Sequence, residues 1–139
     1  MDRRKINNPN VLYPDLSYDI IGSCFDAYNE VGSDKSEKTY QKAAEICLEK
    51  RGRSFKRQVH CPIKFESKNI GDFFLDLLVE DKIVVEFKVG ERFRKKDYDQ
   101  VKAYLQYTKK ELGILVRFSD DGVTYCRILK PFDPDKKDS

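Results

Sequence analysis

The sequence predicts an α/β domain in which helices flank a mixed β-sheet. Segments with apolar residues at helical spacing are interspersed with short segments in which apolar residues alternate with polar ones or run together. Turn-forming residues separate these segments, and the length of 139 residues suits one hydrophobic core. The predicted order of elements is α-α-β-β-β-α-β-β.

Three segments predict helices, at residues 14–32, 36–52 and 91–111. In the first, Ile20 and Cys24 belong to an apolar face with helical spacing. Asp15 or Ser17 is suited to the N-cap, and Gly32 is suited to the end of the helix. The other two segments show the same periodicity, so all three helices are expected to pack one face against a core.

Five segments predict strands, at residues 54–67, 72–79, 83–88, 112–119 and 123–130. Pro62 lies in the first of these, which indicates an edge strand or a bulge because proline has no N–H for a sheet hydrogen bond. Residues 112–119 are apolar on both faces, which favours a central position. Turns are expected at residues 67–71, 80–82 and 120–122.

The composition is 40% hydrophobic and 37% charged, and the net charge of +3 by itself indicates no particular partner. No stretch approaches the roughly 20 apolar residues of a membrane span, and the start "MDRRKINNPN" lacks the apolar region of a signal peptide. We therefore expect a soluble, cytoplasmic protein without a membrane association. One domain is expected at residues 15–130, between polar tails at 1–14 and 131–139.

The cysteines give little support for a zinc site. Zinc sites use about four soft ligands at close spacing, whereas the four cysteines are scattered and the single histidine adjoins one of them. These residues are Cys24, Cys47, His60, Cys61 and Cys126. Reduced and mostly buried thiols are the favoured interpretation.

Charged residues interrupt two of the predicted strands in "FFLDLLVEDKIVVEFK", residues 73–88. Alternation along a strand places Glu86 and Lys88 on one face. If residues 80–82 form a three-residue turn, Asp76 lies directly opposite Glu86 on the neighbouring strand. A two-residue turn would move Glu86 off the face of Asp76.

Two facing carboxylates repel each other unless one is protonated or a cation lies between them. Mg²⁺ prefers oxygen ligands and is often bound by one or two carboxylates together with substrate phosphate. With Lys88 beside them, Asp76 and Glu86 therefore predict a site for phosphodiester hydrolysis. The alternative is a solvent-facing hairpin with three hydrated charges, since E-x-K is common; the apolar neighbours of Asp76 weigh against it.

Four stretches in the same order along the chain resemble the PD-(D/E)-x-K nuclease superfamily and, more narrowly, the GxxExxY family. They are "LSYDIIGSCFDAYNEVG", "EKTYQKAAEICLEKRGRSFKRQ", "IGDFFLDLLVEDKIVVEFK" and "DQVKAYL". The resemblance covers about residues 16–130 and implies a restriction-endonuclease-like core, α-β-β-β-α-β. It implies metal-binding roles for Asp76 and Glu86 and a catalytic role for Lys88.

The resemblance also aligns Glu37 and Tyr40 with the acid and tyrosine of the GxxExxY motif, and Gln100 and Tyr104 with a glutamine and tyrosine that often follow the active-site hairpin. The glycine that opens the GxxExxY motif is Asp34 in this sequence, and a histidine common in the first helix corresponds to Tyr28.

Several of these residues have structural alternatives. Glu37 could bind metal, or it could close a capping box in "DKSE" (34–37). Tyr104 and Tyr40 could belong to the core, with the hydroxyl of Tyr40 finding a partner. Gln100 could reach the hairpin or face water.

Two basic clusters are candidates for phosphate contacts, or are simply a solvated helix end and loop. "EKRGRSFKR" (49–57) has five basic residues and one acid, and "RFRKK" (92–96) has four basic residues. The nucleic-acid-binding residues predicted from these clusters and from the third helix are Arg51, Arg53, Arg92, Arg94, Lys95, Lys96 and Tyr104.

The resulting hypothesis is a nuclease that uses Mg²⁺ or Mn²⁺ and acts on DNA as an endo- or exonuclease, with RNA not excluded and a homodimer possible. Asp76, Glu86, Lys88, Gln100 and Glu37 would form its site. The alternative is a non-catalytic module of the same fold that binds nucleic acid or protein. A hydrolase acting on another substrate has only the paired carboxylates in its favour.

Overall fold

The computed structural model describes residues 12–131, so most of the two predicted tails, 1–14 and 131–139, lies outside the described residues. The helices are α1 (Pro14–Val31), α2 (Glu37–Lys50) and α3 (Lys95–Thr108). The strands are β1 (Phe55–Phe65), β2 (Lys68–Val79), β3 (Ile83–Val89), β4 (Leu112–Ser119) and β5 (Gly122–Leu129). The predicted order of elements is confirmed.

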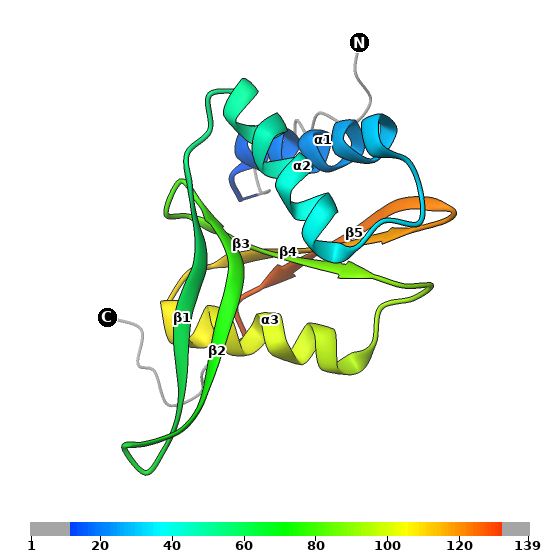
Figure 1. Cartoon of the computed structure of the whole chain (residues 1–139). Helices are drawn as coiled ribbons and strands as arrows, with labels where there is room; N and C mark the ends of the chain where they lie inside the picture. The colour runs from blue at the N-terminus through cyan, green and yellow to red at the C-terminus, as the bar shows by residue number, and fades with distance from the viewer. Residues whose placement is uncertain (1–11, 132–139) are drawn as a thin grey trace.

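The five strands form one sheet in the order β1-β2-β3-β4-β5. Neighbouring strands are antiparallel except β3 and β4, which are parallel and are connected through α3. Helices α1 and α2 cover one face and α3 covers the other (Figure 1). The expected α/β fold with a mixed sheet flanked by helices is therefore confirmed, and β4 has the interior position that its apolar residues predict.

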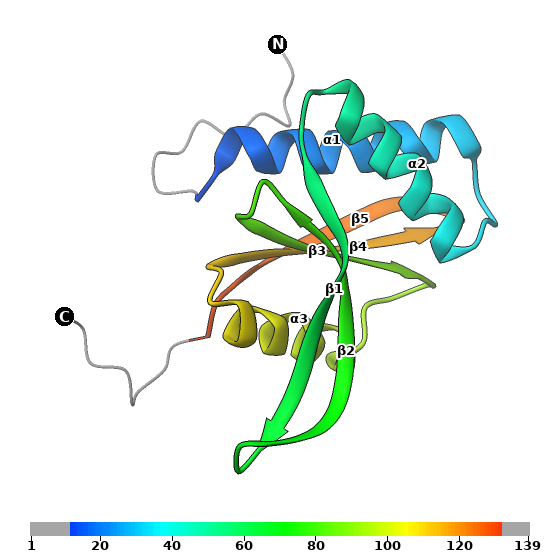
Figure 2. The same ribbon diagram turned by 60° about the vertical axis from the view of Figure 1, so that its left-hand side comes forward.

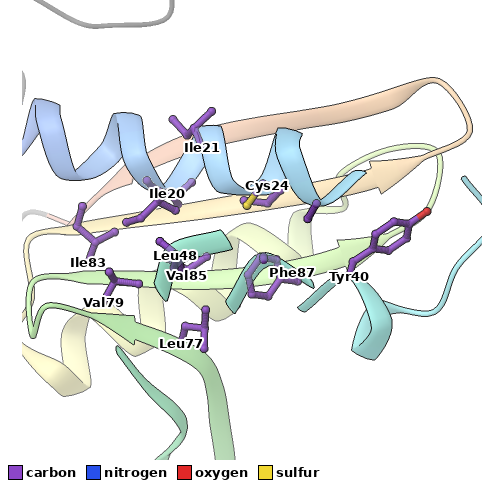
Figure 3. Packing of buried hydrophobic residues seen from close by; sticks show 14 of the residues in the cluster. Ile20, Ile21, Cys24, Tyr40, Leu48, Leu77, Val79, Ile83, Val85 and Phe87 are labelled. Carbon is purple, nitrogen blue, oxygen red and sulfur yellow. The ribbon is translucent and has the colours of Figure 1, made fainter. Parts of the chain in front are cut away.

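The larger core lies between the sheet and the helices α1 and α2 (Figure 3). Tyr40 of α2 is fully buried there, and its ring stacks on Phe118 with centroids 4.3 Å apart. Its hydroxyl donates a hydrogen bond of 2.7 Å to the carbonyl of Gly32. The predicted packing of Tyr40 with a bonded hydroxyl is confirmed, and this contact ties the start of α2 to the end of α1.

A smaller core lies between α3 and the opposite face of the sheet. Val101 and Leu105 of α3 are fully buried against Val84 and Leu115 of the central strands. This packing fixes α3 beneath the end of β3 that carries Glu86 and Lys88.

Some predicted boundaries are wrong for identifiable reasons. Neither Asp15 nor Ser17 caps α1, because Tyr13 is its N-cap and Pro14 is at the first helical position. The third helix begins at Lys95 instead of residue 91, because Arg94 is extended and its N–H donates to the Asp97 carboxylate over 2.9 Å. No helix in the described part of the chain is long and apolar enough to cross a membrane.

The β1–β2 hairpin extends past α3, away from the rest of the sheet (Figures 1 and 2). Its turn is formed by Glu66 and Ser67, both with positive φ, so it is shorter than the predicted turn at 67–71. Strand β1 is an edge strand, and its register with β2 shifts just after Pro62, between Ile63 and Lys64. Pro62 therefore marks both an edge and a bulge, as predicted.

Gly113 lets α3 approach β4 closely, because a Cβ atom at this position would lie 2.5 Å from Cγ1 of the buried Val101. We expect Gly113→Ala to lower the free energy of unfolding by roughly 1–3 kcal/mol, since the β-branched Val101 strongly prefers one χ1 rotamer in a helix and the added methyl overpacks this contact. Urea denaturation measures this. Gly71→Ala is the control, because its Cβ would meet only the flexible end of Ile63 at 3.3 Å; equal losses in both variants would contradict the prediction.

Candidate active site

The candidate site forms where β2 and β3 separate. The two strands are paired at Leu77–Val85, Leu78–Val84 and Val79–Ile83, with residues 80–82 as the turn. In this register Asp76 and Glu86 are the next opposing residues, which confirms the predicted three-residue turn. The backbone ladder of these strands ends there, so two carboxylates occupy the point of divergence.

Each carboxylate binds a backbone amide of the opposite strand. Glu86 Oε1 accepts a hydrogen bond of 2.7 Å from the N–H of Asp76. Asp76 Oδ2 accepts one of 2.8 Å from the N–H of Phe87. The side chains thus satisfy amides that the interrupted ladder leaves unpaired, and one oxygen of each carboxylate makes no backbone bond of this kind.

Both carboxyl groups are held in an environment that disfavours two negative charges. Asp76 is 9% exposed and Glu86 is 3% exposed. Burial raises the pKa of Glu86 well above its usual range, and the charge of Asp76 raises it further. Burial also raises the pKa of Asp76, although the N–H of Phe87 and the charge of Lys88 oppose this. In the absence of a cation the pair therefore retains a proton at neutral pH.

Lys88 extends the pair on the face of the sheet covered by α3. Its Nζ donates a hydrogen bond of 3.1 Å to Gln100 Oε1 and lies 3.9 Å from Asp97 Oδ1. Gln100 Nε2 in turn donates to the Tyr104 hydroxyl over 2.8 Å, and that hydroxyl lies 3.4 Å from the carbonyl oxygen of Phe74. This chain of contacts holds the amino group of Lys88 beside the two acids.

Strand β1, which lies on the side of β2 opposite β3, contributes a polar group. Gln58 has φ +49°, in the left-handed region that few non-glycine residues adopt. Its side chain hydrogen-bonds the carboxylate of Asp76 and lowers the pKa of that group, against the larger effect of burial. Gln41 of α2 donates a weaker bond of 3.4 Å to the carbonyl of Asp76.

Glu37 lies at the start of α2 and faces the same region. Loss of solvation raises its pKa and the charge of Asp76 adds to the shift, whereas Lys88 opposes it. The capping-box interpretation of Glu37 is wrong, because Ser36 is the N-cap and accepts from the N–H of Thr39. The carboxylate of Glu37 is therefore not used as the cap of its own helix.

Asp34, which the sequence resemblance aligns with the first glycine of the GxxExxY motif, has φ +63°. Glycine adopts this left-handed conformation readily, and aspartate is among the side chains that tolerate it. The substitution therefore leaves the turn before α2 in a glycine-like conformation.

Three of the predicted nucleic-acid-binding residues make contacts within the fold. Tyr104 is only 1% exposed, so its ring cannot contact a ligand directly, and its hydroxyl instead positions Gln100. Arg51 and Arg53 both form ion pairs with Asp19, and the second pairs of these arginines are with Asp26 and Glu80. We assign these arginines a structural role at the end of α2 far from Glu37.

The second basic cluster is next to the site. A cavity of about 700 Å³ beside Lys88 is lined partly by Arg92, Arg94 and Lys96. Lys95 points elsewhere and pairs with Asp99 over 3.0 Å, one turn further along α3. This cavity therefore brings three basic side chains close to Lys88, together with the acids Glu91 and Asp97.

A larger cavity of about 880 Å³ adjoins Asp76 on the other side, between α2 and β1. It is lined partly by Glu37, Gln41 and Gln58. One cavity therefore reaches Asp76 and the other reaches Lys88.

The sequence did not reveal Gln58, Gln41 or Asp97 as members of the site. Gln58 lies in a segment whose alternation indicates an ordinary strand, and Asp97 falls inside the predicted helix at 91–111, where an acid indicates no particular role. Their roles depend on contacts between segments far apart in the chain, for which the local sequence carries no signal.

The residues present are suited to a hard divalent cation. Carboxylate oxygens are the ligands that Mg²⁺ and Mn²⁺ prefer, and burial together with the charge of Asp76 raises the pKa of Glu86, so a nearby positive charge would stabilise the ionised pair. Within residues 12–131, no group of three or more His, Cys, Asp or Glu side chains is arranged to hold a metal ion. Glu37 therefore does not complete a three-acid cluster with Asp76 and Glu86.

Comparison with known proteins agrees with this arrangement. The model of the PD-(D/E)XK nuclease superfamily matches residues 14–128. The chain belongs to this superfamily. Nucleases of this superfamily typically use divalent metals. No curated protein matches the chain, and the narrower membership in the GxxExxY family stays a prediction.

Solved structures show the same fold at low sequence identity. The crystal structure of the protein SSO0001 is 19% identical to this chain in sequence. The two structures match with a TM-score of 0.53, and the match covers 69% of this chain and 52% of SSO0001. An alkaline exonuclease from Laribacter hongkongensis is 11% identical, with a TM-score of 0.53 over 86% of this chain and 71% of that one. The chain thus spans about half the length of the first protein.

The buried carboxyl pair predicts a pH-dependent stability. An unfolded Glu86 has a pKa near 4.5 and the folded protein raises it, so the folded state binds the proton more tightly. Stability from this group is therefore complete below about pH 4.5 and is lost as the pH rises toward the folded pKa. We expect Glu86→Gln, which keeps the donor and acceptor geometry, to reduce this loss.

The measurement is urea denaturation with EDTA between pH 5 and pH 8. The wild type should lose stability relative to Glu86→Gln by at most about 1.4 kcal/mol per pH unit. The exposed Glu66→Gln serves as the control and should follow the wild type. Parallel curves for wild type and Glu86→Gln would contradict the assignment of the proton to this pair.

Proposed function

We propose that the protein is a divalent-metal-dependent nuclease that hydrolyses phosphodiester bonds, with DNA as the favoured substrate. The observation that carries this proposal is the pairing of Asp76 and Glu86 at the divergence of β2 and β3, with Lys88 on the same strand as Glu86. Membership of the nuclease superfamily supports it, as does the similarity in fold to an exonuclease.

Asp76 and Glu86 would hold Mg²⁺ or Mn²⁺ through carboxylate oxygens, and Glu37 would take part through a water molecule. When bound, the ion would supply a Lewis acid that lowers the pKa of water and stabilises charge on a phosphoryl oxygen. Gln58 keeps the Asp76 carboxylate oriented.

Lys88 would orient the water that attacks the phosphorus atom. The amino group is suited to this because Gln100 fixes its position at 3.1 Å and Asp97 lies at 3.9 Å. Gln100 acts only through Lys88, so it is a positioning residue. Arg92, Arg94 and Lys96 would bind phosphates that flank the reacting one.

The second candidate function is a nucleic-acid-binding module that keeps the fold without catalysis. The absence of a three-acid metal cluster among the described side chains favours it. Such a module would bind DNA without divalent ions and would release no cleavage products.

The decisive test of catalysis is Lys88→Ala. We expect purified wild-type protein to cleave DNA with Mg²⁺ or Mn²⁺, and the variant to be slower by about 100-fold or more, because a positioned proton-transfer or charge-stabilising group contributes about this much. Lys82→Ala, in the turn just before β3, is the matched control. Undiminished cleavage by Lys88→Ala with an intact circular dichroism spectrum would refute the role of Lys88.

Substitutions in the two basic clusters should affect DNA binding and stability differently. Each of Arg92→Ala and Arg94→Ala should reduce the slope of log Kd against log salt by about one, because one phosphate contact is lost. Arg53→Ala should leave the slope unchanged and lower the thermal stability, since Arg53 pairs with Asp19 and Glu80. Filter binding at several salt concentrations and thermal unfolding measure these effects, and a reduced slope for Arg53→Ala would contradict its structural assignment.

A further inference from the structure

A pair of exposed rings lies next to Asp76 on the β1–β2 hairpin. Phe74 is two residues before Asp76 on β2, and His60 lies directly opposite Phe74 on β1. Gln58, which hydrogen-bonds the Asp76 carboxylate, is two residues before His60. The ring pair is therefore close to the Gln58–Asp76 contact, one cross-strand pair further along the hairpin.

The two rings pack against each other and are both partly exposed to solvent. Their centroids are 5.0 Å apart with planes inclined by 32°, and Phe74 is 51% exposed. The side chain of His60 is 49% exposed, and its Nε2 lies 2.6 Å from Asp72 Oδ1. The contact with Asp72 fixes the imidazole so that it does not need to be ordered when a ligand arrives.

The position of the rings relative to the acids indicates the ligand. Phe74 is two residues from Asp76, or about 6.6 Å along the strand, so a nucleic acid with a phosphate at Asp76 would bring a neighbouring nucleotide over Phe74. Exposed aromatic rings bind nucleobases by stacking, with little dependence on sequence.

We propose that Phe74 and His60 form a stacking platform for an unpaired nucleobase next to the cleaved phosphate. The bases of a continuous duplex stack on their neighbours and cannot offer a face to the platform without unstacking. The substrate class is therefore single-stranded nucleic acid, or a duplex with a frayed or unpaired end. This inference rests on the proposed function, because the direction of the strand is set by a phosphate at Asp76.

A second copy of the chain is a less suitable occupant of this surface. A stable dimer buries about 800 Å² on each partner, whereas this platform has one phenyl ring and one imidazole beside the charged Asp72. A single base has the size and the flat apolar face that such a surface can cover.

The first experiment measures binding without cleavage. Fluorescence anisotropy would follow labelled single-stranded DNA, single-stranded RNA and a blunt DNA duplex with the full chain in EDTA at low salt. Single strands should bind at least 10-fold more tightly than the duplex, and the DNA and RNA arms identify the sugar that the site accepts. Equal affinity for single strand and duplex would overturn the inference.

The variants separate stacking from hairpin stability. Phe74→Ala should weaken single-strand binding by about 5- to 100-fold and leave duplex binding nearly unchanged, while Phe74→Tyr should retain binding. Ile70→Ala is the control, because Ile70 is 65% exposed on the same hairpin and has no ring. Thermal unfolding checks each variant, and His60→Ala provides a second test of the platform if Phe74→Ala does not fold.

A spectroscopic readout distinguishes direct stacking from an indirect effect. The chain has no tryptophan, so Phe74→Trp supplies a single indole signal. Its emission should be quenched by single-stranded oligonucleotide and much less by blunt duplex. Lack of quenching at saturating single strand, or a dimer seen by size-exclusion chromatography that Phe74→Ala dissociates, would overturn the inference in favour of another occupant.

Failure of this inference differs from failure of the proposed function. Metal-dependent cleavage that is indifferent to Phe74→Ala and acts equally on blunt duplex would refute the platform and leave the nuclease intact. Single-strand binding that needs Phe74 without any cleavage would support the platform and refute the nuclease.

Discussion

The site depends on the interruption of a β-ladder. Where β2 leaves β3, the amides of Asp76 and Phe87 lose the carbonyl partners that a regular antiparallel pair would give them, and the carboxylates of Glu86 and Asp76 bind these amides instead. Buried amides must be paired, so this divergence selects for acceptor side chains at both positions. Because carboxylates take the place of the backbone carbonyls as acceptors, two acids come together in a buried position.

This arrangement explains how the protein tolerates two adjacent buried acids when no ion is present. The raised pKa of Glu86 lets a proton take the place of a cation, and Lys88 and Gln58 compensate part of the charge on Asp76. Binding of a divalent ion would then exchange that proton for metal. The site is consistent with stable folding in its metal-free form and with loading at neutral pH.

The two basic clusters show why charge in a sequence does not identify a binding surface. Arg51 and Arg53 are paired with acids from α1 and from the β2–β3 turn, so they stabilise the packing of α1 on α2. Arg92, Arg94 and Lys96 instead line an open cavity next to Lys88. The clusters resemble each other in composition, and only the acids brought near them by the fold separate their roles.

The order of the elements was predictable from the sequence, because it follows from local periodicity. The sequence left open whether Pro62 marks an edge or a bulge and whether the turn at 80–82 has three residues or two; the structure decided both. The convergence of Asp76, Glu86 and Lys88 follows from the register that this turn sets. The contacts of Gln58, the burial of Tyr104, the Ser36 cap that leaves Glu37 free and the pairing of Arg51 were decided by the tertiary structure. Each of these contacts depends on which distant segment of the chain packs beside the residue. The local sequence pattern does not specify which segments meet in the fold.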